Sequence, residues 1–166
     1  MPRFEISTNK VLDYFSDMTS NIYFTREGAP PIKLSPVQAS QLFISFETID
    51  QDAETCWTAL PKDAKREYSH HLGWGCFLTV LIYNGHTYYD IRRWWLPPGA
   101  ENPVPTRMGI RLTQSEVNKL KSFQMELYGA VPEIGNVEPC DCYTGTKYLQ
   151  CQRCNPLWNI YNKNYV

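Results

Sequence analysis

Arginine and tryptophan lie side by side in the middle of the chain, where Arg92 and Arg93 precede Trp94 and Trp95. Exposed residues of these two types bind single-stranded nucleic acid, because the cation contacts phosphates while the ring stacks under a base. The alternative interpretation is a strand with one buried tryptophan. The formal charge of the whole chain is only -1, whereas nucleic-acid-binding domains are usually basic, so the charge has to be judged locally.

Positive charge is concentrated around these tryptophans. Between residues 88 and 112 four arginines stand against two acidic residues, which gives a formal local charge of +2. The charged residues of this stretch are Arg92, Arg93, Arg107, Arg111, Asp90 and Glu101. Basic and aromatic side chains therefore occur in the same region, which favours a binding surface for nucleic acid.

Four cysteines near the carboxyl end form one Cys-x-Cys and one Cys-x-x-Cys pair, with eight residues between the pairs. They are Cys140, Cys142, Cys151 and Cys154. Four thiolates at this spacing suit tetrahedral zinc, and a segment too small for a core of its own gains folding energy from such an ion. Because four sulfurs close the coordination shell, we expect a structural zinc ion, with disulfides or free thiols as the alternatives.

Other classes of protein receive little support. The amino terminus lacks the features of a signal peptide, so we expect an intracellular protein, and no stretch approaches the eighteen or more apolar residues of a membrane span. Nucleophile motifs, glycine-rich phosphate loops and paired carboxylates are not recognisable, so we expect no enzyme. The adjacent His70 and His71 would face opposite sides of a strand, and we expect them at a surface and edge.

The elements that position the arginines and tryptophans can be predicted in order. From Leu72 onward, two aromatic-rich strands are joined by Asn84 and Gly85, a pair typical of tight hairpin turns. The proline-rich segment 97–105 predicts a loop, and 107–112 a short strand. A helix then begins at Thr113, which forms a capping box with Glu116.

The first third of the chain contains a second copy of this ending at an offset of 78 residues. The matched pairs are Ile32 with Ile110, Leu34 with Leu112, Ser35 with Thr113 and Leu42 with Leu120. Ser35 and Gln38 form a capping box of their own around Pro36, so a second strand-to-helix unit is predicted. The stretch 21–31 before its helix resembles the corresponding strand and loop of the other copy, but it has no tryptophan and only one arginine, Arg26. A chance similarity of two short units is the alternative.

The stretch from Leu72 to Phe123 resembles the positive cofactor four family of transcriptional coactivators. The residues that carry the resemblance are Asp90, Ile91, Arg92, Trp95, Pro97, Gly99, Gly109, Ile110, Leu112 and Thr113. The resemblance implies a curved four-stranded antiparallel sheet backed by a helix, with helices that pair into dimers and sheets that bind single-stranded or melted DNA. It places Arg92 and Trp95 at strand contacts and Arg107 at a basic position, whereas Met108 replaces a frequent lysine.

We therefore predict an α+β fold in which two related copies form a pseudo-dimer, with a true homodimer as the alternative. The expected parts are a degenerate coactivator-like half over 1–50, a linker over 51–67, a nucleic-acid-binding half over 68–130 and a zinc-binding tail over 131–166. The segment before the second copy is polar, and a short helix over Trp57 and Leu60 is the alternative to a linker.

The expected nucleic-acid-binding residues are Trp95, Arg92, Arg93, Arg107, Trp74 and Arg111. Alternation along a strand favours Trp95 as the stacking ring with Arg93 beside it, and leaves Trp94 to the core, whereas the resemblance favours Arg92. This conflict stays open at the level of sequence.

The predicted function is non-enzymatic binding of single-stranded DNA in transcription or replication, in the nucleus and together with proteins of those machineries. The alternative is a protein-interaction module of a transcription or virion assembly that has lost nucleic-acid binding. The residues do not distinguish DNA from RNA, or a cellular from a viral owner.

Overall fold

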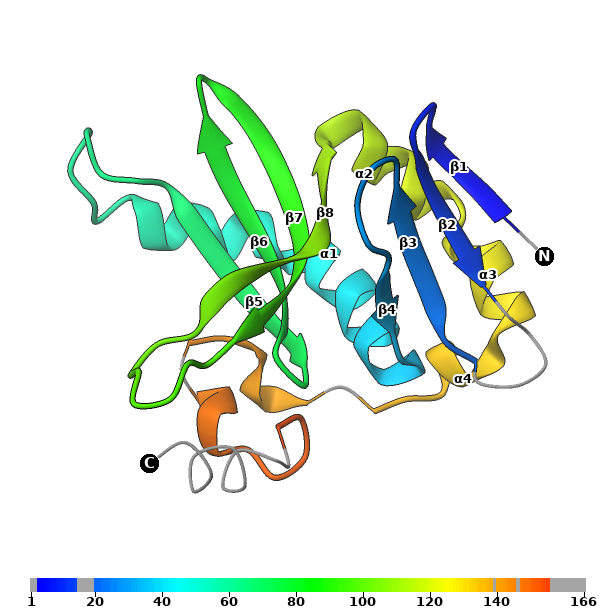
Figure 1. Ribbon diagram of the computed structural model, residues 1–166. Coiled ribbons are helices and arrows are strands. Elements are labelled where there is room, and N and C mark those ends of the chain that lie inside the picture. The colour runs from blue at the N-terminus through cyan, green and yellow to red at the C-terminus, as the bar shows by residue number, and fades with distance from the viewer. Residues whose placement is uncertain (1–2, 15–19, 139, 146, 156–166) are drawn as a thin grey trace.

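The computed structural model describes residues 3–14, 20–138, 140–145 and 147–155, and it contains two antiparallel sheets of four strands each. In both sheets the strands follow one another in chain order (Figure 1). The first sheet consists of β1 (Arg3–Ser7), β2 (Lys10–Tyr14), β3 (Ile22–Arg26) and β4 (Ile32–Leu34). The second consists of β5 (Glu67–Gly73), β6 (Cys76–Tyr83), β7 (His86–Trp95) and β8 (Val104–Thr113).

Each sheet is followed by a helix, and after the second sheet two more short helices and two 3-10 turns follow. The helices are α1 (Pro36–Trp57), α2 (Gln114–Ser122), α3 (Gln124–Ala130) and α4 (Pro132–Gly135), and two short 3-10 turns, η1 (Asp141–Tyr143) and η2 (Lys147–Gln150), lie in the tail. The α+β class predicted from the sequence is confirmed. None of the helices in the described ranges is long and apolar enough to cross a membrane.

The first two hairpins of the second sheet, β5–β6 and β6–β7, turn through residues with positive φ. Asn84 and Gly85 join β6 to β7 with φ of 52° and 78°, as the Asn-Gly pair predicted. Trp74 and Gly75 join β5 to β6 in the same way, with φ of 55° and 78°. A tryptophan is an uncommon residue in this conformation, and here it places the Trp74 ring at the tip of the hairpin, where 44% of its surface is exposed.

The two predicted capping boxes are present and mark equivalent points of the two copies. The Ser35 hydroxyl accepts from the Gln38 amide at 3.3 Å, and the Gln38 side chain accepts from the Ser35 amide at 2.8 Å. Thr113 and Glu116 make the same two bonds at 3.3 and 2.9 Å. The strand residues matched by the offset, Ile32, Leu34, Ile110 and Leu112, are all buried. The order of four strands and a capped helix thus occurs twice.

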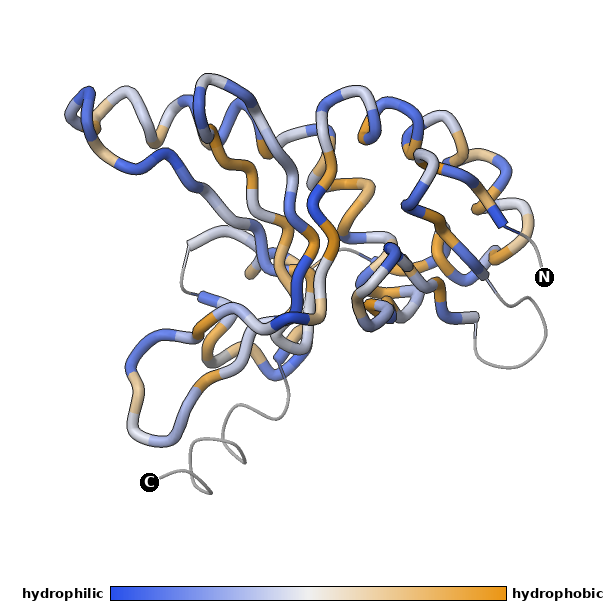
Figure 2. Tube along the Cα trace, turned by 45° about the horizontal axis from the view of Figure 1, so that its top comes forward, coloured by the Kyte–Doolittle hydropathy of each residue, from blue (hydrophilic) through white to orange (hydrophobic). Residues whose placement is uncertain are grey.

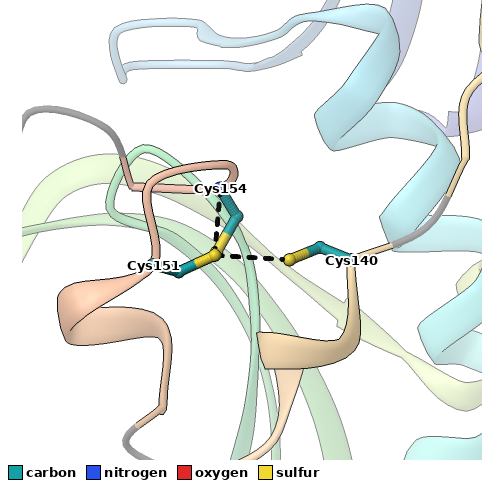
Figure 3. Close-up of side chains that lie close together, drawn as sticks. All are labelled: Cys140, Cys151 and Cys154. Carbon is teal, nitrogen blue, oxygen red and sulfur yellow. Dashed lines mark hydrogen bonds between the residues drawn. The ribbon is translucent and has the colours of Figure 1, made fainter.

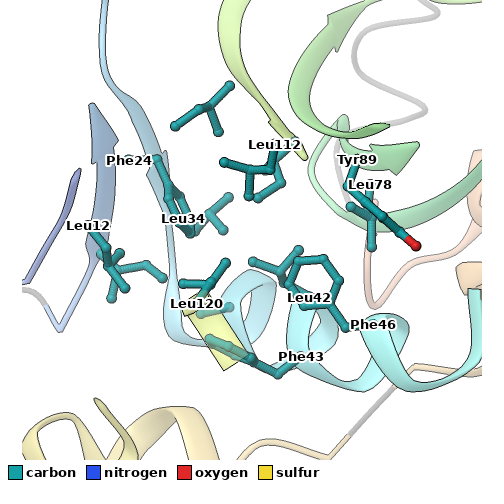
Figure 4. Close-up of a cluster of buried hydrophobic side chains, with 14 of the residues drawn as sticks. Leu12, Phe24, Leu34, Leu42, Phe43, Phe46, Leu78, Tyr89, Leu112 and Leu120 are labelled. Atoms are coloured by element: carbon teal, nitrogen blue, oxygen red, sulfur yellow. The ribbon is translucent and has the colours of Figure 1, made fainter. Parts of the chain in front are cut away.

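The two copies share one hydrophobic core. Helix α1 of the first copy packs against β5 and β6 of the second sheet, and α2 of the second copy reaches β1 of the first. There the ring of Phe123 stacks on Phe4 with centroids 4.4 Å apart. Figure 4 shows Leu12, Phe24 and Leu34 of the first sheet facing the same cluster as Leu78 and Leu112 of the second. Neither sheet is therefore covered by its own helix alone.

Hydropathy follows this arrangement. Figure 2 shows hydrophobic residues along the strands and helices where the copies meet, and hydrophilic residues in the peripheral loops. Sharing a core in this way lets two short units bury apolar surface that neither could cover alone.

The segment between the copies differs from the predicted linker. Helix α1 continues through Trp57, so the linker expected over 51–67 is partly helical, and β5 begins already at Glu67. The Trp57 indole donates to the Glu67 carbonyl at 3.4 Å, which ties the helix end to the strand. The alternative of a short helix over Trp57 and Leu60 holds for Trp57, where α1 ends, whereas Leu60 lies beyond the helix.

His70 and His71 lie on opposite faces of β5, but both are buried, contrary to the expected surface and edge positions. Strand β5 is an edge strand of its sheet, yet α1 and Tyr143 of the tail cover the His70 face, and Tyr148 of the tail covers the His71 face. His70 bonds Asp52 of α1 at 3.0 Å, and His71 stacks on Tyr148 of the tail at 4.3 Å. Packing that the local sequence does not reveal therefore buries both rings.

Candidate functional site

A basic cavity of about 610 Å³ lies on the face of the second sheet that points away from the core. Asp90, Arg92 and Arg111 point into it because they alternate along β7 and β8 with core residues such as Ile91 and Ile110. The charged residues that line it are Arg26, Lys65, Arg92, Arg107, Arg111, Glu67 and Asp90. Five positive charges against two negative ones leave a formal charge of +3, although the whole chain is slightly acidic.

Arg92 is held inside this cavity by three hydrogen bonds. Its guanidinium donates to the two carboxylate oxygens of Asp90 at 2.8 and 3.0 Å and to the Thr106 carbonyl at 2.7 Å. A side chain at Gly109 would collide with Arg92, because a Cβ there would lie 2.6 Å from the Arg92 Cζ. Gly109 therefore leaves the space that Arg92 needs to lie across β8. Only 15% of the Arg92 side chain is exposed, so its first role is to organise the cavity.

Three other arginines remain available for an anionic ligand. Arg107 is exposed and makes no hydrogen bond or ion pair with any described residue. Arg111 is half exposed and lies 3.5 Å from Asp90, at the outer limit of a contact. Arg26 comes from β3 of the first copy, and its Nε donates to the Gly109 carbonyl at 3.2 Å. Sequence reasoning missed Arg26 as a site residue, because nothing in the sequence says that β3 lies beside β8.

A second cavity, of about 370 Å³, lies at the end of the same sheet and is mainly aromatic. Its rings come from the β5–β6 turn, the end of β7 and the tail, and the ring-bearing residues are Trp74, Phe77, Trp94, Trp95, His71 and Tyr148. Arg93 also lines it, and its Nη1 donates to the Trp74 carbonyl at 3.4 Å. Trp95 is 47% exposed, in agreement with the exposed ring expected at this position.

Strand alternation predicted that Trp94 lies in the core, and this prediction is wrong. Trp94 is only partly buried, lines both cavities and packs edge-on against Phe77 with centroids 5.7 Å apart. The pairing of β7 with β8 shifts register between Arg92 and Trp94, which breaks the simple alternation. The same shift allows Arg93, Trp94 and Trp95 to line one cavity.

The six expected binding residues therefore divide into two groups. Arg92, Arg107 and Arg111 line the basic cavity, while Trp74, Arg93 and Trp95 line the aromatic one. Trp94 and Thr106 belong to both walls, so the two cavities adjoin.

The tail brings its cysteines together. The sulfurs of Cys140, Cys151 and Cys154 all lie within 4.8 Å of one another, and Cys140 and Cys151 are 3.6 Å apart (Figure 3). Cys142 lies close enough to this cluster to share a hydrogen bond with Cys151. That bond is the main cause that raises the pKa of the Cys142 thiol to about 11. Three sulfurs within 4.8 Å of one another, with a fourth nearby, form a donor set that fits a tetrahedral metal ion.

One cysteine of the cluster is prepared to ionise. Burial alone would raise the pKa of Cys151, but hydrogen bonds from the backbone amides of Cys154 and Arg153 outweigh it and lower that pKa to about 6. A lowered pKa favours the thiolate of Cys151, which is the form of cysteine that binds a metal ion.

The tail is fixed to the end of the second sheet, as Figure 1 shows. The Trp74 amide donates to the Cys154 carbonyl at 2.8 Å, and Tyr148 packs against Phe77 with centroids 5.2 Å apart. The cysteine cluster thus supports one wall of the aromatic cavity. The rest of the predicted tail, 156–166, lies outside the described residues.

Comparison with known proteins agrees with this geometry for one part of the chain. Residues 70–123 match the family model of Transcriptional Coactivator p15 (PC4). No curated protein and no solved structure gives a significant match. The matched span runs from β5 to the end of α2 and includes the arginines and tryptophans of β7 and β8, whereas the first copy and the cysteine cluster lie outside it. Over residues 70–123 this chain is therefore similar to the transcriptional coactivator p15 (PC4) family.

Proposed function

We propose that this protein binds single-stranded or melted DNA along the basic cavity of its second sheet and acts without catalysis in transcription or replication. The observation that carries the proposal is the convergence of Arg26, Arg107 and Arg111 on one cavity with a formal charge of +3. Phosphates are attracted to such a concentration of cations even when the protein as a whole is nearly neutral. An intracellular and nuclear location follows from this role.

Each group of residues has a distinct part in binding. Arg107 and Arg111 contact phosphates from β8, and Arg26 contacts them from the first copy. Arg92 fixes the shape of the cavity through Asp90. Trp95 offers an exposed ring beside the phosphate path, so a base can stack on it with little sequence preference.

Fluorescence anisotropy of a labelled single-stranded oligonucleotide in rising salt tests the proposal. We expect binding that weakens steeply with salt, and Arg107→Ala should reduce the slope of log affinity against log salt by about 0.7, the value for one phosphate contact on a single strand. Lys121→Ala is the matched control, because Lys121 is an exposed cation on α2 away from the cavity. Trp95→Ala should cost about 1 to 3 kcal/mol of binding. Binding that is independent of salt, or equally weakened by the control, would contradict the proposal.

A protein-docking module is the second candidate function. The chain has a formal charge of -1, and the exposed Met108 stands where the family resemblance predicts a lysine. Exposed tryptophan beside arginine is also typical of protein interfaces. Met108→Lys separates the two functions: it should strengthen oligonucleotide binding if the cavity binds phosphates, and leave it absent if the surface has lost nucleic-acid binding. The same titration with RNA of equal sequence distinguishes the two nucleic acids.

We further propose that Cys140, Cys142, Cys151 and Cys154 bind one structural zinc ion. The proximity of three sulfurs, all within 4.8 Å of one another, and of the fourth supports this set. Metal analysis of the purified protein should find one zinc per chain, and Cys154→Ser should lower this content, whereas Cys56→Ser should not, because Cys56 lies on α1 far along the chain and is exposed. An unchanged zinc content in Cys154→Ser would refute the assignment.

The two copies in one chain also lead us to propose a pseudo-dimer that needs no second chain to complete its core. Light scattering coupled to gel filtration tests this, because a homodimer would give twice the mass of a single chain.

A further inference from the structure

The aromatic cavity beside the phosphate path has the size and the walls of a small-molecule pocket. Its volume of about 370 Å³ falls within the roughly 300 to 1,000 Å³ that is usual for ligand sites. Trp74 and Trp95 expose 44% and 47% of their surfaces at it, and Tyr148 closes it from the tail. Flat rings on several sides favour a flat ligand that can stack.

Two wall residues of this cavity carry buried nitrogen atoms without a partner among the described residues. They are Nε1 of Trp94 and Nδ1 of His71. His71 accepts a hydrogen bond from the Gly75 amide at its other nitrogen, Nε2, at 3.2 Å, which assigns the ring proton to Nδ1. Both orphaned atoms are therefore N–H donors. A buried donor without an acceptor costs free energy, so each of them indicates that an acceptor belongs nearby.

The cavity is also continuous with the proposed phosphate path. Trp94 and Thr106 line both cavities, and Arg93 adds a cation to the aromatic one. A strand whose phosphates lie along Arg107 and Arg111 therefore passes the opening.

We propose that the aromatic cavity is a pocket for one unstacked nucleobase, and that it prefers bases with carbonyl oxygens, such as thymine, over adenine, which has none. The base stacks between the tryptophans and Tyr148 while its carbonyl accepts from the indole of Trp94. This inference rests on the proposed function. It adds a contact that the tail makes, outside the family-matched residues 70–123, and therefore makes base binding depend on the cysteine cluster.

The test compares oligothymidine and oligodeoxyadenosine of equal length on the wild type and on Trp94→Phe. The substitution keeps an aromatic ring, removes the N–H donor and also reduces the stacking area, a loss that both bases share. We expect the wild type to prefer thymine, and Trp94→Phe to lose about fivefold more in thymine affinity than in adenine affinity, the effect of one hydrogen bond. Because both oligonucleotides are measured on both proteins, self-stacking of adenine does not affect the comparison.

A second pair of variants tests the tail wall. Tyr148→Ala should weaken thymine binding, whereas Tyr143→Ala should not, because Tyr143 packs edge-on against His70 on the other face of β5. Thermal melts confirm that each variant is folded. If Trp94→Phe and Tyr148→Ala both leave a salt-sensitive, Arg107-dependent affinity unchanged, the base pocket is refuted while the proposed function stands. If no oligonucleotide binds the wild type at low salt, both are refuted, and the cavity would then accommodate a side chain of a protein partner.

Discussion

On the proposed function, Asp90 stabilises the second sheet and lowers its affinity for phosphate. Its side chain is 6% exposed, and it holds Arg92 with two hydrogen bonds while Arg111 lies 3.5 Å away. Asp90→Asn keeps the shape of the side chain and removes its charge. One oxygen can still accept from Arg92, but the new amide group faces a guanidinium that can only donate.

The expected loss of stability follows from these contacts. Breaking a buried ion pair by removing one partner costs about 3 to 5 kcal/mol. Arg92 keeps its bond to the Thr106 carbonyl and one bond to residue 90, so we expect about 2 to 3 kcal/mol for Asp90→Asn. With a urea dependence of roughly 2 to 3 kcal/mol per molar, this moves the unfolding midpoint by about 1 M.

The same substitution should strengthen binding to single-stranded DNA. It raises the formal charge of the cavity by one, and a unit charge removed about 6 Å from a phosphate in water changes the energy by about 0.7 kcal/mol, or about threefold in affinity. Urea unfolding and anisotropy on the same preparation measure the two effects. Asp63→Asn is the matched control, because Asp63 is exposed and makes no ion pair with a described residue. Unchanged stability, or weaker binding by a folded Asp90→Asn, would refute the reasoning and show that the orientation of Arg92 matters more than the charge.

Three further results are expected. Gly109→Ala places a Cβ against Arg92 and should cost about 1 to 3 kcal/mol in urea unfolding, whereas Gly129→Ala, where a Cβ meets no atom within 4 Å, should not destabilise the protein. Burial lowers the pKa of His71 to about 4 from 6.5, so the stability that neutral His71 contributes is complete above pH 6.5 and is lost as the pH falls towards 4. This should remove up to about 3 kcal/mol from the unfolding free energy, and the His71→Phe variant should not show that part of the pH dependence. Tyr89→Phe removes a hydroxyl that donates to Asp50 at 2.7 Å and should cost about 1 kcal/mol in the same assay; a neutral effect would mean that the bond is replaced by water without loss.

Local signals in the sequence predicted much of the fold. The capping boxes at Ser35 and Thr113 and the turn at Asn84 are each decided by residues within three positions of one another, so they can be read without knowledge of the rest of the chain. The burial of His71 could not be read in this way. It depends on Tyr148, which is 77 positions away and reaches β5 only because the tail folds back.

The candidate site was predictable in its residue types but not in its geometry. Alternation along a strand predicts sides only while the pairing stays regular, and the register shift after Arg92 brings Trp94 out of the core. Arg26 was overlooked because its contribution comes from the meeting of two sheets, which no spacing in the sequence reports. Contacts between segments distant in the sequence, rather than local secondary-structure propensities, define the geometry of the candidate site.

The joining of both copies in one polypeptide frees them to diverge. In an assembly of identical chains every substitution occurs twice, so the two faces must keep the same chemistry. Here the two copies retain equivalent capping boxes. Only the second copy carries tryptophans on a strand, at the end of β7, and the first copy contributes Arg26 to the cavity of the second sheet. Selection can therefore refine the binding face of one copy without changing the other. On the proposed function, a single binding site also gives the bound strand one 5′-to-3′ direction, which a symmetric pair of sites does not.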